Sequence, residues 1–180
     1  LTEGFATIVR PEDLPEKIVS VGRAMLGNDI RIIDEDGAPL PQGQAGEIIG
    51  YSPILMKRYH NNPEQTEAAI WRDPASGRTF LRSGDIGRLD KDGFLYLLDR
   101  KKDMILVSGF NVYPNEVEDV VAGHPGVENC AVIGVPDEKT GEAVKLYVVA
   151  SDANLTAEDI KTFCKDKLTG YKLPRQIEFR

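Results

Sequence analysis

Residues 99–118 read DRKKDMILVSGFNVYPNEVE, and this stretch marks the boundary between two kinds of sequence. It opens with five consecutive charged residues, 99–103, which lie between two apolar segments. Short apolar runs separated by turn residues come before it, and helix and strand patterns alternate after it. A polar connector between two pieces of different architecture is a typical place for a hinge, because a few residues there can absorb a change in backbone torsion. The sequence therefore predicts two domains, residues 1–99 and residues 100–180.

The first domain is predicted to be mostly β. Short apolar segments at 30–33, 46–49, 87–89 and 94–98 are bounded by Gly, Pro and Asp residues that favour turns. Residues 90–93 predict a hairpin loop, since Gly93 tolerates a positive φ. One short helix is expected to begin at Pro63 and to include Ala68, Ala69 and Ile70.

The second domain is predicted to alternate strands with two helices. Apolar strands are expected at 104–107, 130–135, 144–150 and 176–179. The first helix begins at Pro114 and places valines at i, i+3 and i+4, and the second follows a capping-box pattern at Thr156 and Asp159. The order β-α-β-β-α-β predicts a small α+β sheet domain, so the whole chain is expected to be a mixed α/β protein.

Composition excludes several classes of function. The 22 Lys and Arg against 29 Asp and Glu give a net charge of −7, which repels a polyanion, so no nucleic acid is expected as a partner. No apolar run approaches the roughly 20 residues that cross a bilayer, which predicts no transmembrane segment. Cys130 and Cys164 lie in apolar surroundings, as expected for buried reduced thiols in a cytoplasmic protein. Peripheral membrane contact and oligomeric state stay open.

Two charged residues near the boundary are candidates for binding a nucleotide. Asp85 follows Ser83-Gly84, and an ionised carboxylate in such a turn can accept hydrogen bonds from both hydroxyls of a ribose. Arg100 in the charged connector could reach a ribose or a phosphate, because its guanidinium is always charged. The alternatives are a plain turn at Gly84 and a solvated charged surface at 99–103. The residues alone do not decide between them.

A third pattern is the Ser108-Gly109-Phe110 segment, which precedes the helix at Pro114. Gly109 indicates either a simple turn or the close approach of a ligand to the backbone. His60 and His124 lie beside turn residues with no nucleophile or carboxylate pattern nearby, which favours structural roles. The sequence has none of the hydrolase, metalloprotease or P-loop motifs.

Taken in order, several motifs resemble those of the adenylate-forming acyl-CoA synthetases, and most of all the long-chain fatty-acid–CoA ligases of bacteria. The resemblance runs over the whole chain and corresponds to the C-terminal portion of that family. It implies an ATP-dependent ligase that activates a carboxylic acid as acyl-AMP and transfers the acyl group to coenzyme A, with Mg²⁺ as the metal. The motifs lie at residues 1–3, 46–48, 82–85, 99–105, 108–118 and 169–174.

The resemblance also implies roles for single residues. Thr2 would contact the α-phosphate of ATP and Glu3 would hold Mg²⁺. Asp85 would bind the ribose hydroxyls with help from Arg100, and Lys102 would be the hinge. Residues 1–99 would be the β-barrel-like C-terminal subdomain of the large adenylation domain, and residues 100–180 a small mobile lid.

The same resemblance places coenzyme A against the lid. Ser108, Gly109 and Phe110 would line the tunnel for the pantetheine arm. Tyr171 and Arg175 would contact the adenine and the phosphate of coenzyme A. The phosphate-binding loop and the acyl pocket of the family would lie before Leu1, and the adenylation lysine beyond Arg180, so the chain itself is expected to hold no catalytic residue and to be inactive alone.

Three functional hypotheses remain from the sequence. The first is part of a fatty-acid–CoA ligase, and the second is part of a ligase for aryl or alicyclic acids, because the acyl pocket lies outside this sequence. The third is a non-catalytic module that binds an adenine nucleotide or coenzyme A. At one motif this chain has Ser83 where the family usually has Thr, a change that keeps the hydroxyl group.

Overall fold

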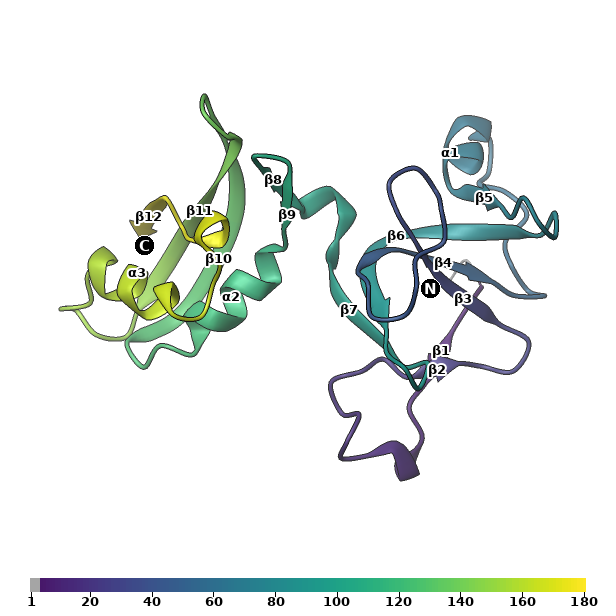
Figure 1. Cartoon of the computed structure of the whole chain (residues 1–180), viewed down its shortest axis with the longest axis horizontal. Helices are drawn as coiled ribbons and strands as arrows, with labels where there is room; N and C mark the ends of the chain where they lie inside the picture. Colours follow the sequence, from purple (N-terminus) through teal and green to yellow (C-terminus); the bar gives the residue numbers. More distant parts are fainter. Residues whose placement is uncertain (1–3) are drawn as a thin grey trace. The chain divides into compact units, whose positions relative to one another are not determined.

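The computed structural model describes residues 4–180, so Thr2 and Glu3 lie outside the described residues. The chain divides into two compact units, Leu1–Lys101 and Lys102–Arg180, called unit 1 and unit 2 below. Several β-sheets and few helices make up the two units, as Figure 1 shows, and this confirms the predicted mixed α/β class. None of the helices in the described part of the chain has both the length and the apolarity needed to cross a membrane.

Unit 1 is built on a five-stranded antiparallel sheet in which β3, β4 and β6 are neighbours in that order. On its other side, β6 pairs with β5 through its first residues and with β7 through its last residues. Two short strands, β1 and β2, pair separately. The strands are β1 (Thr7–Ile8), β2 (Arg23–Ala24), β3 (Asp29–Ile33), β4 (Gly46–Tyr51), β5 (Ile70–Arg72), β6 (Thr79–Leu89) and β7 (Leu95–Arg100), with a 3₁₀ turn η1 (Pro11–Asp13).

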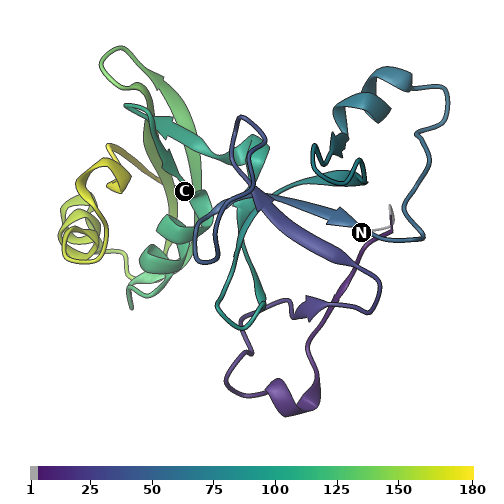
Figure 2. The same ribbon diagram turned by 45° about the vertical axis from the view of Figure 1, so that its right-hand side comes forward.

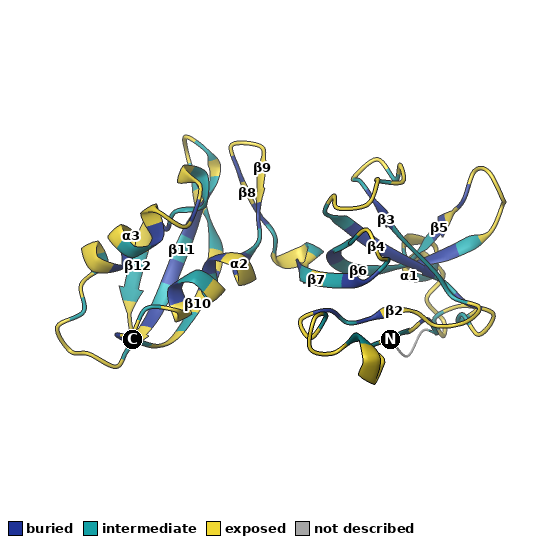
Figure 3. Cartoon of the chain, turned by 60° about the horizontal axis from the view of Figure 1, so that its bottom comes forward, coloured by how far each residue is buried: buried dark blue, intermediate teal, exposed yellow. Residues whose placement is uncertain are grey.

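The core of unit 1 lies against the central strands β4 and β6. Ile48 and Leu81 are buried on one side with Phe5, and Ile49 and Phe80 are buried in a second cluster. Burying each of these large apolar side chains contributes about 1.5–3 kcal/mol. Gly50 permits the packing of Phe5, because a Cβ there would lie 2.3–2.5 Å from atoms of the Phe5 ring. Figure 3 shows the buried residues in dark blue along these strands.

The short helix α1 (Pro63–Ala68) begins where the sequence predicts, and the Asn62 side chain caps it by accepting a hydrogen bond from the Gln65 N–H. It ends earlier than expected, because Ile70 belongs to β5 and pairs with Leu81 of β6. Tertiary pairing with a neighbouring strand here overrides a local helical pattern.

Unit 2 contains a second five-stranded sheet. Its order is β10-β11-β8-β9, and β12 runs parallel to β11. The long hairpin of β10 and β11 is seen in green in Figures 1 and 2. The elements are the 3₁₀ turn η2 (Lys101–Asp103), which begins one residue before the boundary, then β8 (Ile105–Val107), β9 (Phe110–Val112), α2 (Pro114–Ala122), β10 (Val127–Asp137), β11 (Gly141–Ala150), α3 (Ala157–Lys165), the 3₁₀ turn η3 (Gly170–Lys172) and β12 (Gln176–Phe179).

The strand β9 is an addition to the predicted order of elements. Ser108 and Gly109 have φ of +52° and +83°, so they form a two-residue turn that folds β9 back onto β8. A non-glycine residue with positive φ is uncommon, and the sequence gives no sign that Ser108 adopts it. The observed order in unit 2 is therefore β-β-α-β-β-α-β.

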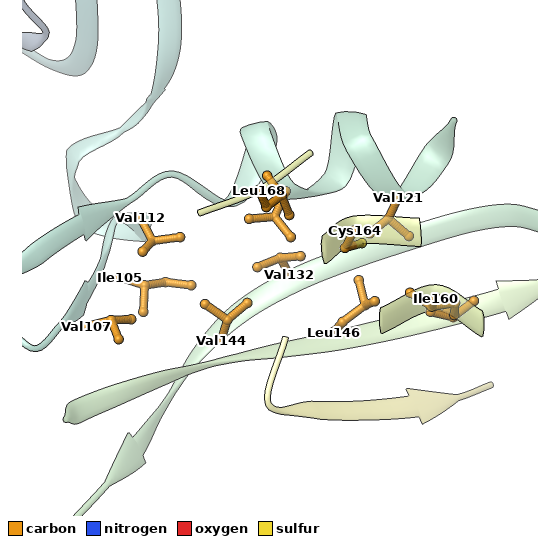
Figure 4. Close-up of a cluster of buried hydrophobic side chains, with 12 residues drawn as sticks. Ile105, Val107, Val112, Val121, Val132, Val144, Leu146, Ile160, Cys164 and Leu168 are labelled. Atoms are coloured by element: carbon orange, nitrogen blue, oxygen red, sulfur yellow. The ribbon is translucent and has the colours of Figure 1, made fainter. Parts of the chain in front are cut away.

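Both helices of unit 2 bury one face against the sheet. Val117 and Val121 of α2 and Ile160 and Cys164 of α3 have no exposed surface, and they form one cluster with strand residues such as Leu146 (Figure 4). The capping box predicted for α3 is present, since Thr156 and Asp159 each accept a backbone N–H of the other. The two helices are thus fixed on the sheet by their apolar faces.

Candidate functional site

Asp85 and Arg100 lie opposite each other on adjacent strands of unit 1. They are register partners in the β6–β7 ladder, and Arg100 Nη1 lies 2.9 Å from Asp85 Oδ1. The Asp85 side chain is 20% exposed and that of Arg100 is 57% exposed, so both reach solvent. The structure therefore joins the two nucleotide candidates that lie fifteen positions apart in the sequence.

A bulge in β6 brings Asp85 to this position. Glu47 pairs with Ile86 and Ile49 with Arg82, so the single residue Ile48 faces residues 83–85 of β6. Gly84 in the bulge has φ of +72°, and the Ser83 hydroxyl accepts a hydrogen bond from the Asp85 N–H at 3.0 Å. Bulges of this kind redirect side chains and are frequent beside binding sites. The Gly84 turn is thus part of the strand and gives Asp85 its position.

A cavity of about 340 Å³ lies beside the Asp85 carboxylate within unit 1. Most of its lining is apolar, and Ser83 and Asp85 are polar residues in that lining. An apolar concavity with a few convergent polar groups is typical of a small-molecule site. Its lining residues are Phe5, Ala6, Thr7, Val21, Ile48, Ser83, Asp85, Leu95 and Leu97.

The buried carboxylate of Glu47 lies close to this site; the sequence analysis included it in the motif at residues 46–48 but assigned it no role. The Glu47 side chain is only 5% exposed, and its Oε2 accepts hydrogen bonds from Arg82 Nη1 and Lys101 Nζ, both at 2.8 Å. A buried charge requires such partners, because desolvation strongly disfavours it alone. The sequence signal was one Glu inside the otherwise apolar segment Gly46–Tyr51.

The predicted hinge residue Lys102 is the first residue of unit 2, and the 3₁₀ turn η2 spans it. Within residues 4–180, the structure gives its side chain no ion pair, whereas Arg100 and Lys101 before it each have one. The connector is therefore tied to unit 1 up to Lys101.

In unit 2 the structure brings together Phe110 and Tyr171. Their rings stack with centroids 4.9 Å apart and planes inclined by 22°. Lys172 Nζ, next to Tyr171, donates to both carboxylate oxygens of Glu116 at 2.6 and 2.7 Å. The turn η3 thus holds the β8–β9 hairpin through Phe110, which is 56% exposed.

Arg175 has a different partner from the stacked rings: its Nη1 pairs with Asp137 Oδ1 at 3.2 Å. The Thr140 hydroxyl donates to Asp137 as well, and it is the main cause that lowers the pKa of that carboxyl group. The guanidinium is 47% exposed and keeps free donors.

The side chains of His124, Cys130 and Cys164 contribute to packing. The His124 ring packs edge-on against Phe163, and its Nδ1 accepts the Gly126 N–H, as its predicted structural role requires. Burial raises the pKa of the Cys130 and Cys164 thiols, which keeps them protonated at neutral pH. Between residues 4 and 180, no group of three His, Cys, Asp or Glu side chains is arranged to hold a metal ion.

Comparison with known proteins identifies the family of the chain. The family model described as AMP-binding enzyme matches residues 1–60, and the one described as AMP-binding enzyme C-terminal domain matches residues 116–180. A long-chain-fatty-acid–CoA ligase of Escherichia coli O6:H1 is 46% identical over 172 residues, which cover 96% of this chain and 30% of that protein. A feruloyl-CoA synthase of an Amycolatopsis species is 42% identical over 165 residues, and this alignment covers 91% of this chain and 32% of that protein.

The fold of a solved ligase is also similar. The o-succinylbenzoate CoA synthetase of Bacillus subtilis, solved with its acyl-adenylate intermediate, superposes with a TM-score of 0.86 at 35% sequence identity. The superposition covers 100% of this chain and 36% of the synthetase chain. The chain thus spans about a third of the length of the relatives it matches. The two family matches, the relatives and the shared fold show that the chain belongs to the family of AMP-binding, adenylate-forming enzymes.

Proposed function

We propose that this chain is part of an AMP-forming acid–thiol ligase that converts a carboxylic acid, with a fatty acid as the leading class, into its coenzyme A thioester. The observation that carries the proposal is the ion pair of Arg100 with Asp85, which also lines a largely apolar cavity. Curated relatives named long-chain-fatty-acid–CoA ligase support the substrate class at 42–48% identity.

The chemistry has two displacements. In the first, a carboxylate oxygen attacks the α-phosphorus of ATP, the bond to the β-phosphate oxygen breaks, and pyrophosphate leaves. In the second, the thiol of coenzyme A loses its proton to solvent, its sulfur attacks the acyl carbon, and AMP leaves. Neither step needs a protein nucleophile, so the protein contributes binding, orientation and compensation of charge.

Within this chain, Asp85 is the residue proposed to bind the nucleotide. Its carboxylate accepts hydrogen bonds from the two ribose hydroxyls, and the ion pair with Arg100 fixes its orientation. The Arg100 guanidinium has donors beyond those used by Asp85, and these are available to the ribose or the phosphate. The largely apolar cavity beside Asp85 would shield one side of the nucleotide from water.

We further propose that unit 1 closes the large adenylation domain and that unit 2 is a mobile lid that turns at Lys102. The division of the chain between Lys101 and Lys102 supports this assignment. In the lid, Ser108, Gly109 and Phe110 would line the passage for the pantetheine arm. The open surroundings of Gly109 suit that role, because no residue other than its two chain neighbours comes within 4 Å of the position that a Cβ would take. Tyr171 and Arg175 are proposed to lie along the path of coenzyme A.

Mg²⁺ would compensate charge on the phosphates during adenylation. The family resemblance implies Glu3 as the residue that holds it and Thr2 as the contact of the α-phosphate, and both residues lie outside the described part of the chain. The proposed cytoplasmic location rests on the two free thiols.

A panel of acids tests the function in the longer protein from which this chain comes. We expect ATP-dependent pyrophosphate release with long-chain fatty acids to exceed that with ferulate and o-succinylbenzoate. The second candidate, an aryl-acid ligase, is favoured by the similarity to feruloyl-CoA synthase and o-succinylbenzoate CoA synthetase, and the reverse order of rates would establish it.

The chain alone provides a control. Residues 1–180 should catalyse no ATP–pyrophosphate exchange with any acid, because the proposed phosphate loop, acyl pocket and adenylation lysine are not among them. Exchange by this chain would contradict the assignment of roles. Binding of nucleotide by the longer protein without pyrophosphate release from any acid would favour a non-catalytic module instead.

A further inference from the structure

Glu47 forms a contact within unit 1 that the proposed nucleotide site does not explain. Its buried Oε2 accepts from Arg82 and from Lys101, both at 2.8 Å. Arg82 lies on the adjacent strand β6 and is permanently charged, so it alone provides the cation that a buried carboxylate requires. Lys101 is therefore a second cation on an oxygen that already has a strong partner.

The contact between Glu47 and Lys101 lies next to the boundary between the two units. Lys101 is the last residue of unit 1, and Glu47 lies 54 positions earlier in the centre of the sheet. The Lys101 ammonium is anchored on a side chain that is 5% exposed, although its own side chain is 40% exposed. A flexible lysine gains little from an ion pair at the surface, but its partner here is held rigidly by the sheet.

The preceding residue is fixed in the same way. Arg100 is the last residue of β7 and pairs with Asp85 at 2.9 Å, so two consecutive connector residues are each tied to unit 1 by an ion pair. In the described part of the chain, Lys102 has no such tie. The restraint on the connector ends where unit 2 begins.

We propose that Glu47 is a positioning residue that acts through Lys101: it clamps the unit 1 end of the connector, so that backbone rotation begins at Lys102 and does not disturb the Asp85–Arg100 pair. This inference rests on the proposed function for its purpose, since a lid that turns about a bound nucleotide must not pull on the residues that hold the ribose. Its physical content, the position at which the connector becomes mobile, does not depend on any activity.

Nuclear magnetic resonance relaxation of the 180-residue chain tests the clamp without ligands. In the wild-type chain we expect order parameters of about 0.85 through Lys101 and a fall below about 0.6 that begins at Lys102 or Asp103. Lys101→Met keeps the length of the side chain and removes the ammonium, and the fall should then begin at Arg100 or earlier. Glu47→Gln should likewise move the start of this fall in order parameters to Arg100 or earlier.

One control variant and one outcome distinguish a clamp from general stabilisation. Lys91→Met removes an ammonium from an exposed hairpin lysine and should leave the profile unchanged. A Lys101→Met profile that superposes on the wild-type profile, even with a lower melting temperature, would show a merely stabilising ion pair and would overturn the proposal. Lys101→Met keeps the test valid if Glu47→Gln does not fold. A negative acid panel leaves this result unaffected, so the two proposals fail separately.

Discussion

Asp85 carries the most direct prediction at the scale of a single residue. In the longer protein, Asp85→Asn should raise the KM for ATP about 10- to 100-fold, because a hydrogen bond to a charged group contributes about 1.5–3 kcal/mol. Steady-state pyrophosphate release measures this KM. Asp36→Asn, at an exposed turn of unit 1, is the matched control and should leave KM unchanged. An unchanged KM in the Asp85 variant would remove this carboxylate from the nucleotide site.

Asp90 provides a prediction about pH at the same scale. Burial alone would raise its pKa, but hydrogen bonds from Lys17 and from the backbone N–H groups of Phe94 and Asp92 outweigh it and lower the pKa to about 2. A carboxyl group with a lowered folded pKa stabilises the fold above its unfolded pKa of about 3.8, and this contribution is lost as the pH falls toward 2.

The loss can be measured through Trp71, the single tryptophan, which is buried in unit 1. Urea unfolding followed by its fluorescence should show the free energy of unfolding falling between pH 5 and pH 2, with about 1–2 kcal/mol of the fall due to Asp90. Asp90→Asn should make the fall smaller by that amount. An equal fall in the variant would assign the effect to other carboxyl groups.

At the scale of elements, the stacked rings of Phe110 and Tyr171 connect the β8–β9 hairpin to η3. We expect Tyr171→Ala to raise hydrogen exchange at residues 108–111 by about tenfold, since an aromatic pair adds roughly 0.5–1.5 kcal/mol beyond its buried area. Tyr171→Phe keeps the stack and is the matched control. Equal exchange in the Ala variant and the wild type would show that the Ser108-Gly109 turn holds the hairpin alone.

At the scale of the whole molecule, the boundary at Lys102 separates the two half-reactions. Lys102→Pro in the longer protein fixes φ and removes one N–H, so it should slow thioester formation at least tenfold while acyl-AMP formation keeps its rate. Single-turnover assays of each step check it. An equal loss in both steps would contradict the assignment of the hinge, because adenylation serves as the internal control.

Much of this organisation could be predicted from the sequence because it is local. The helix starts at Pro63 and Pro114, the capping box at Thr156 and the loop at Gly93 depend on neighbours within four residues, and all four are present. The early end of α1 at Ala68 and the strand β9 were missed for the opposite reason. Each depends on a partner strand or on an unusual torsion of Ser108, which no local pattern reveals.

By itself the sequence determined the mixed α/β class, the change in architecture near residue 100 and the resemblance to adenylate-forming ligases, since these depend on composition, periodicity and residue order. Only the tertiary structure decided that Asp85 faces Arg100 across two strands and that Glu47 binds Lys101. Both contacts depend on strand register, and the β6 bulge that shifts the register forms only when β4, β6 and β7 pair.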